Sequence, residues 1–582
     1  MQEKKKMLLA AINAKYIHSN LAVYSLQAYA KEYQEQIGLA EYTINQNPDD
    51  ILKGIFRYHP EVLCFSCYIW NISYVKDLIR EIHKILPDTK IWVGGPEVSY
   101  DAFRVLQEYP ELTGVMKGEG EVTFLELARF YLDGIGSLEQ IKGITYRDET
   151  GEIKENVWRE VTDLSTIPFV YQDLDKFEHR IIYYESSRGC PFSCSYCLSS
   201  IDKKLRFRNL ELVKKELQFF LDHKVPQVKF VDRTFNCKHD HAMEIWEYLI
   251  AHDNGITNFH FEVAADLLNE EEIQLIKTMR PGMIQLEIGV QSTNMDTIRE
   301  IHRKMDFAQV SAVVRKIQEG HNVHQHLDLI AGLPYEDYTS FGKSFCDVYA
   351  LRPQQLQLGF LKVLKGSFMY QEAEHYGCVC QSREPYEVLY TKWLPYEDVL
   401  RLKLVEEMVE VYYNSNQFNQ TIRAMERLFE TPFALYEALG AFYDKKGYMD
   451  ISHTRIRRYE ILLEFLAEQQ VGEEAMEEYR QWMIYDLYSR ENMKTRPSWA
   501  KDLKEVKEEM RAFYQYEAEH REYLPDYQGY DEKQLAKMTH LERMDVHPVT
   551  GKKEACWVLF DYKHRDILTY DARTVVIEEI NR

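Results

Sequence analysis

Two long blocks of the sequence alternate short apolar runs with segments of helical periodicity, and this alternation limits the fold more than any other feature. The first block covers residues 6–135. Strand–helix repetition of this length predicts a parallel sheet with helices on both faces. We therefore expect an α/β domain over residues 1–135. Its predicted strands are residues 6–13, 41–45, 61–68, 90–95 and 113–118.

The second block, residues 181–370, repeats the pattern with six strand–helix units. A complete barrel of this type has eight such units, so six predict a partial (β/α)6 barrel of the TIM type. Active-site residues of such folds lie at the carboxyl ends of the strands. The predicted strands are residues 181–187, 225–232, 258–265, 283–290, 324–332 and 355–361.

Two further regions complete the chain. Residues 136–180 form an expected connector, with a hairpin around residues 149–151. Residues 371–582 are dominated by acidic, aromatic-rich helical patterns. Apolar alternation over residues 554–580 predicts a β-hairpin at the end of this mainly helical region.

The carboxyl ends of the first-block strands are rich in glycine and polar residues. Parallel sheets bind ligands beyond these ends, and glycine lets a bulky ligand approach the backbone closely. The candidates there are Asn13, Tyr68 to Asn71, Gly94, Gly95, Pro96, and Gly118 to Glu121.

Charge and apolar content narrow the class of protein. The chain has a net charge of −22 and lacks the broad basic surface of non-specific nucleic-acid binders. This disfavours a nucleic-acid partner. Only KKLRFR, residues 203–208, is locally basic, and a solvated helix entry explains it as well as a phosphate contact. No apolar window reaches the length of a membrane span, so we expect no membrane partner. The apolar run after the basic N-terminus is better explained by a first strand than by a signal peptide.

The cysteines point to a reducing compartment. The chain has ten, most of them single within strand or helix patterns. Buried single thiols are typical of the cytoplasm, which is the predicted location. Cys64 and Cys67 form a CxxC, but on a strand these residues point to opposite faces, so a redox or metal pair is not expected.

Three cysteines gather in one loop, RGCPFSCSYC, after the first strand of the second block. Cys190, Cys194 and Cys197 have the spacing CxxxCxxC. Three thiolates on one loop can ligate three irons of a [4Fe–4S] cluster and leave the fourth open to an amino and a carboxylate group. A structural zinc site requires a fourth ligand, which this loop lacks. The spacing and its place after a strand therefore predict an iron–sulfur site.

CxxxCxxC at the first strand of a partial barrel resembles the radical S-adenosylmethionine (SAM) superfamily. The supporting segments are VDRTFN (231–236), FEVAADLL (261–268), LEIGVQS (286–292) and DLIAGLP (328–334). The resemblance implies reductive cleavage of SAM to a 5′-deoxyadenosyl radical. It also implies that Tyr196 packs on the adenine and that Glu262 and Glu287 lie near the ribose or amino group of SAM. Gln291 and Ser292 are expected to line the same pocket.

The first domain resembles the Rossmann-like, flavodoxin-like cobalamin-binding domain of one radical SAM subclass, by way of SCYIWN (66–71), VGGPEVS (93–99) and GEGE (118–121). The DxHxxG motif that supplies a histidine to cobalt is missing from the first 135 residues, and the nearest string, DVHPVTG, lies at 545–551. The resemblance then implies that Ser66, Tyr68 or Trp70 meets the lower face of cobalt. Gly94, Gly95, Pro96, Gly118 and Glu119 are expected to contact the corrin or its nucleotide.

Together these expectations describe a cobalamin-dependent radical SAM enzyme that modifies a small-molecule or peptide substrate, with C-methylation as one outcome. Its electron donor would be a flavodoxin or a ferredoxin. Two alternatives stay open at this point. One is an RNA-modifying enzyme of the methylthiotransferase kind, which would need a basic surface and a second cluster motif. The other is a non-catalytic cobalamin or redox sensor.

Overall fold

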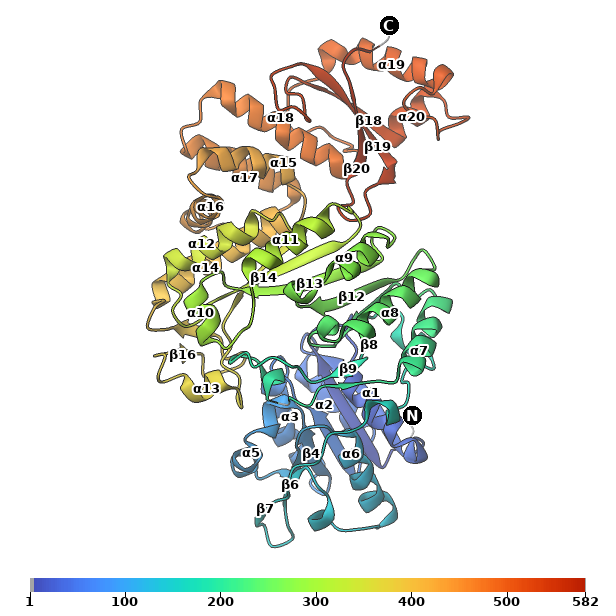
Figure 1. Cartoon of the computed structure of the whole chain (residues 1–582), viewed down its shortest axis with the longest axis vertical. Coiled ribbons are helices and arrows are strands. Elements are labelled where there is room, and N and C mark those ends of the chain that lie inside the picture. The colour runs from blue at the N-terminus through green and yellow to red at the C-terminus, as the bar shows by residue number, and fades with distance from the viewer. Residues whose placement is uncertain (1–4, 202, 581–582) are drawn as a thin grey trace. The chain divides into compact units, whose positions relative to one another are not determined.

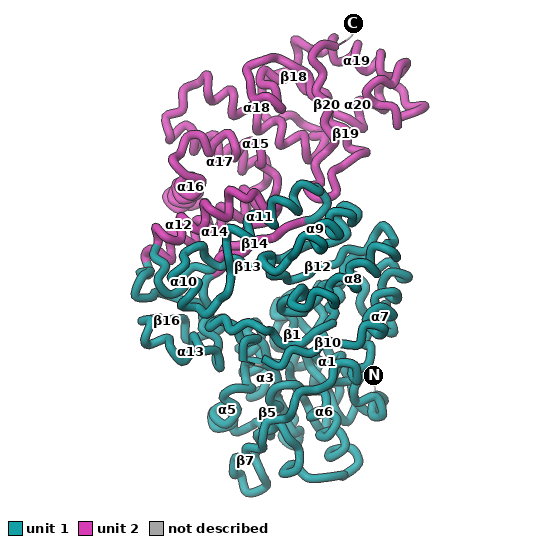
Figure 2. The backbone as a smooth tube through the Cα atoms, viewed as in Figure 1, with its two compact units in different colours: residues 1–323, 330–337, 360–396 teal, residues 324–329, 338–359, 397–582 magenta. Residues whose placement is uncertain are grey.

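A computed structural model describes residues 5–201 and 203–580 and divides them into two compact units (Figure 2). Unit 1 takes the described part of Met1–Val323 with Ile330–Asp337 and Phe360–Tyr396. Unit 2 takes His324–Leu329, Tyr338–Gly359 and the described part of Glu397–Arg582.

The first sheet of unit 1 has the strand order β2-β1-β3-β4-β5-β6-β7. Strands β1 to β5 run parallel, and the hairpin β6–β7 joins the edge of β5 in antiparallel fashion. The parallel part agrees with the prediction for residues 1–135, although β2 begins at Ile37 rather than at residue 41. The bounds are β1 (Met7–Asn13), β2 (Ile37–Thr43), β3 (Val62–Ser66), β4 (Lys90–Gly94), β5 (Leu112–Met116), β6 (Ile144–Arg147) and β7 (Ile153–Glu155).

The hairpin around residues 149–151 was expected, but its place in this sheet was not. Its residues fall in the segment predicted to be a connector between two domains. Thr145 pairs with Val115 and has no exposed surface, so the hairpin covers an edge of the sheet that would otherwise be open.

Helices cover both faces of this sheet (Figure 1). Leu8, Ala10 and Ile12 pack with α2, α3 and α5, whereas Met7 and Leu9 pack with α1 and α6. This period of two is the alternation expected of a strand buried on both sides. The helices are α1 (Leu21–Tyr29), α2 (Pro48–Phe56), α3 (Ile72–Ile85), α4 (Pro96–Ser99), α5 (Ala102–Glu108) and α6 (Glu121–Ala128).

The Cys64 and Cys67 side chains lie in different core clusters, with Cys64 on the α1/α6 side and Cys67 on the α2/α3 side. The prediction that they do not form a pair is therefore confirmed.

The second sheet of unit 1 contains parallel strands in the order β13-β12-β11-β8. Strand–helix alternation continues into β14 and β15, so the six strands expected over residues 181–370 are all present. They are β8 (Ile182–Tyr184), β11 (Gln227–Phe230), β12 (Asn258–Val263), β13 (Ile284–Gln291), β14 (His324–Ala331) and β15 (Gln355–Phe360). The helices between them are α7 (Leu210–Asp222), α8 (His239–Ala251), α9 (Glu270–Lys277), α10 (Met295–Glu300), α11 (Phe307–Gln318) and α12 (Tyr338–Tyr349).

The segment Phe360–Tyr396 of unit 1 adds α13 (Phe368–Glu372) and a small antiparallel pair, β16 (Val379–Cys380) and β17 (Val388–Tyr390).

Unit 2 is helical over most of its described length and ends in a small sheet. A terminal hairpin was predicted and is present as β19 (Cys556–Arg565) and β20 (Ala572–Ile577). A third strand, β18 (Thr539–Met544), pairs with β19 and was not predicted, because its short sequence THLERM follows a helix directly. The longer helices are α14 (Tyr396–Val409), α15 (Asn419–Met425), α16 (Pro432–Lys446), α17 (Arg455–Glu468), α18 (Glu473–Arg490), α19 (Lys507–His520) and α20 (Glu532–Met538).

Among the residues that the structure describes, no helix has the length and apolar character to cross a membrane.

Candidate functional site

The three clustered cysteines lie in a loop whose two ends are tied together. Strands β9 (Ser187–Arg188) and β10 (Arg206–Phe207) form an antiparallel ribbon that closes the base of this cysteine loop. Cys190 and Cys194 are 8% and 7% exposed, and Cys197 is half-buried. The loop is also held from outside, because Ser195 N donates to Ile301 O at 2.9 Å and Met369 N donates to Ser195 O at 2.8 Å.

A buried cation lies against one of the thiols. Arg303 Nη1 donates to Cys194 Sγ at 3.7 Å, and Arg303 Nη2 donates to Gly289 O. Burial raises the pKa of the Cys194 thiol, and the Arg303 guanidinium opposes that rise. Arg303 was not singled out in the sequence. It stands 109 positions from Cys194 in the chain, and the available signal was a basic residue in the loop after a strand–helix unit of the barrel.

Gln291 and Arg303 present buried polar atoms without a protein partner. Gln291 Oε1 and Arg303 Nε are buried and accept or donate no hydrogen bond among the described residues. Gln291 also has a positive φ of 74°, a conformation that costs a non-glycine residue free energy and recurs at ligand sites. Gln291 is the last residue of β13, and Arg303 lies after α10, where it contacts the cysteine loop at Cys194. These atoms suit a polar ligand such as SAM beside the three thiols.

Tyr196 is half-buried in the cysteine loop, and burial raises its pKa, with Arg303 opposing the rise. Its ring and the Arg303 cation therefore share one environment with the Cys194 thiol.

Glu262 and Glu287 are directly opposite each other on β12 and β13. Glu287 accepts from Lys229 at 3.2 Å and lies 2.9 Å from His260 Nε2. Burial alternates along these strands, so that Lys229, Glu262 and Glu287 share the less buried face of the sheet. The structure thus brings the two predicted carboxylates together on one face and supplies Glu287 with a cationic neighbour.

Ser292 does not line this face. It is fully buried, donates to Glu336 Oε1 at 2.6 Å and accepts from Asn294 N at 3.0 Å. Its hydroxyl organises the turn before α10, and its part in a SAM pocket together with Gln291 stays a prediction.

A buried polar network supports the residues that precede the cysteine loop. Asp232 accepts from Ser186 N, Ser186 Oγ and Ser187 Oγ at 2.9, 2.6 and 2.6 Å. Burial raises the pKa of Asp232 to about 6, although these hydrogen bonds act to lower it. His241 Nε2 lies 3.0 Å from Ser186 Oγ, and burial lowers the pKa of His241 to about 4.

The carboxyl edge of the first sheet contains a close backbone approach at Gly95. Its φ is +114°, and a Cβ there would lie 2.5 Å from Cys67 O. Gly118 has a φ of +70°, and a Cβ there would lie 3.3 Å from the Trp158 ring. The chain therefore requires glycine at Gly95, where the loop after β4 packs directly on the backbone of Cys67. Gly94 and Pro96 flank this approach, at the end of β4 and the start of α4.

Tyr68 and Trp70 stack on each other after β3. Their ring centroids are 4.5 Å apart with an interplanar angle of 5°, and Trp70 Nε1 donates to Ile12 O at 3.2 Å. Trp70 is 41% exposed, so this pair presents an aromatic surface at the edge of the sheet. Ser66 lies beneath, where its hydroxyl accepts from Asn20 Nδ2 at 3.0 Å.

Glu119 is held by protein groups. It accepts from Thr162 N at 2.7 Å and pairs with Arg206. Arg208 pairs with Glu216 at 2.5 Å. Both arginines of the basic segment 203–208 are therefore paired with carboxylates, which agrees with neither a solvated helix entry nor a free phosphate contact.

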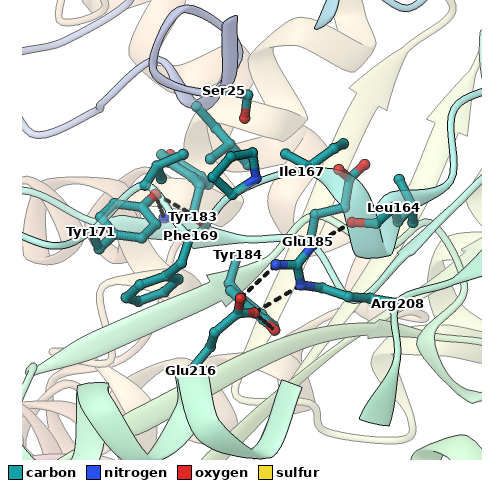
Figure 3. Close-up of a pocket in the computed structure, with 13 residues that line it drawn as sticks. Ser25, Leu164, Ile167, Phe169, Tyr171, Tyr183, Tyr184, Glu185, Arg208 and Glu216 are labelled. Carbon is teal, nitrogen blue, oxygen red and sulfur yellow. Dashed lines mark hydrogen bonds and ion pairs between the residues drawn. The ribbon is translucent and has the colours of Figure 1, made fainter. Parts of the chain in front are cut away.

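A small cavity lies between the connector, α1 and β8 (Figure 3). Its volume is about 40 Å³, room for water molecules but not for a cofactor. Figure 3 shows Arg208 and Glu216 paired at its wall and Tyr171 bonded to Tyr183. These polar groups are satisfied within the protein, so the cavity is a packing feature.

Comparisons with protein families match three regions of the chain. Residues 7–128 match the B12 binding domain, residues 184–345 match the radical SAM superfamily, and residues 374–560 match a protein family of unknown function, DUF4080.

Curated relatives share these regions in part. The cobalamin-dependent radical SAM methyltransferase TokK of Streptomyces tokunonensis is 25% identical over 331 residues, 54% of this chain and 47% of TokK. The hopanoid C-3 methylase of Methylococcus capsulatus is 26% identical over 274 residues, 45% of this chain and 51% of the methylase. The chain thus spans about half the length of these relatives.

Solved structures share the fold. OxsB, a cobalamin-dependent SAM radical enzyme solved with aqua-cobalamin and SAM bound, gives a TM-score of 0.57 at 16% identity. The match covers 83% of this chain and 80% of the OxsB chain. The radical SAM methyltransferase TsrM of Kitasatospora setae, solved with cobalamin and a [4Fe–4S] cluster bound, gives a TM-score of 0.54 at 17% identity and covers 65% of this chain and 79% of the TsrM chain. The predicted α/β fold, with its B12-binding and radical SAM domains, is confirmed.

Proposed function

We propose that this chain, in which a B12 binding domain precedes a radical SAM domain and a DUF4080 region, is a cobalamin-dependent radical SAM enzyme that methylates carbon in its substrate. The observation that carries the proposal is the contact between the two strand-end regions. Glu121, the first residue of α6 after β5, pairs with Arg188 of β9, which follows β8 and leads into the cysteine loop, with Arg188 Nη2 2.8 Å from Glu121 Oε1.

The cysteine loop fits an iron–sulfur cluster. Cys190, Cys194 and Cys197 would supply three thiolates, and the missing fourth ligand leaves one iron for SAM. The buried, unpartnered oxygen of Gln291 and the Arg303 guanidinium would bind polar groups of SAM next to it. Tyr196, Glu262 and Glu287 would contact the rest of that molecule.

The edge of the first sheet fits a corrin. Gly95 and Gly118, both with positive φ, form the loops after β4 and β5 that would contact a flat macrocycle, and Gly94 and Pro96 shape the first of these loops. The stacked pair of Tyr68 and Trp70 would face the lower side of cobalt with an aromatic surface instead of a histidine. Glu119, which pairs with Arg206, would contact the same macrocycle or its nucleotide.

The two cofactors supply complementary chemistry when bound: the cluster provides the electron that cleaves SAM, and cobalamin provides methyl transfer. The chain's own residues bind and orient these groups. Arg303 places a positive charge beside Cys194, and the fully buried Asp232 fixes the backbone from which the cysteine loop starts.

We place the enzyme in the cytoplasm, where cysteines stay reduced, with a flavodoxin or ferredoxin as electron donor. The substrate we propose is a small molecule or peptide. An RNA substrate is disfavoured, because Arg206 and Arg208 of the one basic segment are paired with Glu119 and Glu216.

Label transfer tests the methylation. The reconstituted protein is incubated anaerobically with reductant, cobalamin and SAM deuterated in its methyl group, together with a small-molecule extract of the producing cells. We expect a product heavier by a labelled methyl group, formed by the wild type and lost in Cys194→Ala. Formation of 5′-deoxyadenosine without any labelled product would exclude methylation and leave another cobalamin-assisted radical reaction. Absence of both 5′-deoxyadenosine and labelled product would favour a non-catalytic cobalamin or redox sensor.

A further inference from the structure

The ribbon at the base of the cysteine loop places two arginines opposite each other. Arg188 of β9 and Arg206 of β10 are register partners in an antiparallel pair. Their side chains are 22% and 14% exposed. Like charges directly opposite each other destabilise a ribbon unless anions lie between them. The loop that holds all three cysteines therefore depends on a source of negative charge outside it.

The B12 binding domain supplies two of those anions. Glu121 accepts from Arg188 Nη2 at 2.8 Å, and Glu119 pairs with Arg206 and lies 3.6 Å from Arg188. Glu185 of the barrel completes the set, with oxygens 2.8 and 2.7 Å from Arg188. We call Glu119, Glu121, Glu185, Arg188 and Arg206 the charge cluster.

The charge cluster lies close in sequence to both proposed cofactor sites. Arg188 is two residues before Cys190. Glu119 follows Gly118, whose positive φ marks the loop where a corrin would lie. Glu121, 6% exposed, opens α6 and is fixed by the fold of the B12 binding domain. The two segments are thus joined by ion pairs that share several hydrogen bonds and whose side chains are between 6% and 22% exposed.

We propose that Arg188 is a positioning residue that couples the two cofactor sites, so that the loaded cysteine loop strengthens cobalamin binding and bound cobalamin strengthens SAM binding. Each cofactor orders its own loop, and the charge cluster transmits that order, so the second cofactor loses less conformational entropy on binding. Because binding free energies are linked, the two enhancements have the same factor. This inference rests on the proposed function, since it needs both cofactors.

The experiment is a binding titration. Hydroxocobalamin affinity is measured anaerobically on the full chain in two states, one with the reconstituted cluster and SAM and one stripped of iron. The wild type is expected to bind cobalamin at least about fivefold more tightly in the first state. In Arg188→Gln and in Glu121→Gln this ratio is expected to fall below the wild-type value, because the pair of Glu119 and Arg206 remains as the other link, while both states still bind cobalamin.

Two controls make the result decisive. Glu126→Gln removes another ion pair between α6 and the connector, with Arg159, that does not touch the cysteine loop, and should keep the wild-type ratio. Arg188→Lys keeps the charge and should keep part of the ratio. Circular dichroism and cluster content establish that each variant is folded and loaded. If Arg188→Gln does not fold or does not take up the cluster, Glu121→Gln provides the test in its place.

The outcomes separate this inference from the proposed function. A wild type that binds no cobalamin in either state contradicts the proposed function. A wild type that binds cobalamin equally in both states, or an Arg188→Gln variant that keeps the full ratio, overturns the coupling alone.

Discussion

Arg303 donates from Nη1 to Cys194 Sγ at 3.7 Å, and so places a buried positive charge against one of the three thiols proposed to hold the cluster. A cation at this distance stabilises the reduced, more negative cluster. We predict that Arg303→Gln lowers the reduction potential by on the order of 50 mV or more. Arg303→Lys should stay close to the wild type.

The measurement is a redox titration of the reconstituted cluster followed by electron paramagnetic resonance. It reports the potential of the loaded fraction, and so is independent of how much cluster each variant takes up. An unchanged potential in Arg303→Gln would contradict an electrostatic role for this residue.

Gly95 allows a second test, because its backbone is constrained in two ways. Gly95→Ala would meet a positive φ and a contact of 2.5 Å with Cys67 O. Gly151, with a φ of +86° and no heavy atom within 4 Å, is the matched control. We predict a loss of about 1 kcal/mol in the free energy of unfolding for Gly151→Ala and about 3 kcal/mol or more for Gly95→Ala.

Urea unfolding followed by circular dichroism measures both losses. Gly95→Ala should also weaken cobalamin binding, whereas Gly151→Ala should not. Equal losses for the two variants would contradict this prediction, because they would mean that the backbone around Cys67 moves away from the new methyl group without loss of stability.

His241 predicts a dependence of stability on pH. Burial is the largest cause that lowers its pKa, to about 4 from 6.5, with Lys238 adding to the effect. The folded protein therefore holds the neutral ring, and protonation favours the unfolded chain. The stabilisation is complete above pH 6.5 and is lost as the pH falls toward 4, with a total of about 3 kcal/mol.

His241→Gln removes that titration. The difference in free energy of unfolding between wild type and variant, measured at several values of pH, should shrink as the pH falls from 6.5 to 4. This difference isolates His241 from Asp232, whose raised pKa of about 6 acts with the opposite sign. A constant difference would show that His241 does not titrate in this range.

The small sheet of unit 2 contains a buried carboxylate, Glu542, which pairs with Arg496 and lies 2.8 Å from His540 Nε2. Arg496 donates two hydrogen bonds of 2.7 Å to Glu542 of β18, whose side chain is 2% exposed. Glu542→Gln leaves Arg496 with an uncompensated charge and should cost about 3–5 kcal/mol in unfolding free energy. The exposed pair of Lys553 and Glu474 is the control, and Glu474→Gln should leave the free energy of unfolding close to that of the wild type, because solvent screens this pair. Similar losses for both would contradict the role of burial.

Local pattern predicted the parts of the fold that local physics decides. Apolar alternation located β1, β3, β4 and β5, and the strand period separated Cys64 from Cys67. The third strand of the C-terminal sheet, β18, was not predicted, because THLERM gains its strand conformation from pairing with β19.

Contacts between distant segments were not visible in the sequence. No feature of the sequence indicated that the Glu119 carboxylate pairs with Arg206, 87 residues away, and its contact with a cofactor stays a prediction. Ser292 follows Gln291 directly, and its hydroxyl donates to Glu336, 44 residues further along the chain. Arg303 carried no motif of its own and became part of the site only through the fold.

The central claim is tested most directly by 5′-deoxyadenosine. The protein is reconstituted anaerobically with iron, sulfide and cobalamin, given SAM and dithionite, and assayed for 5′-deoxyadenosine beside its ultraviolet–visible spectrum. The account predicts a bound corrinoid spectrum and 5′-deoxyadenosine that disappears in Cys194→Ala. No 5′-deoxyadenosine from a protein with a full cluster would contradict it.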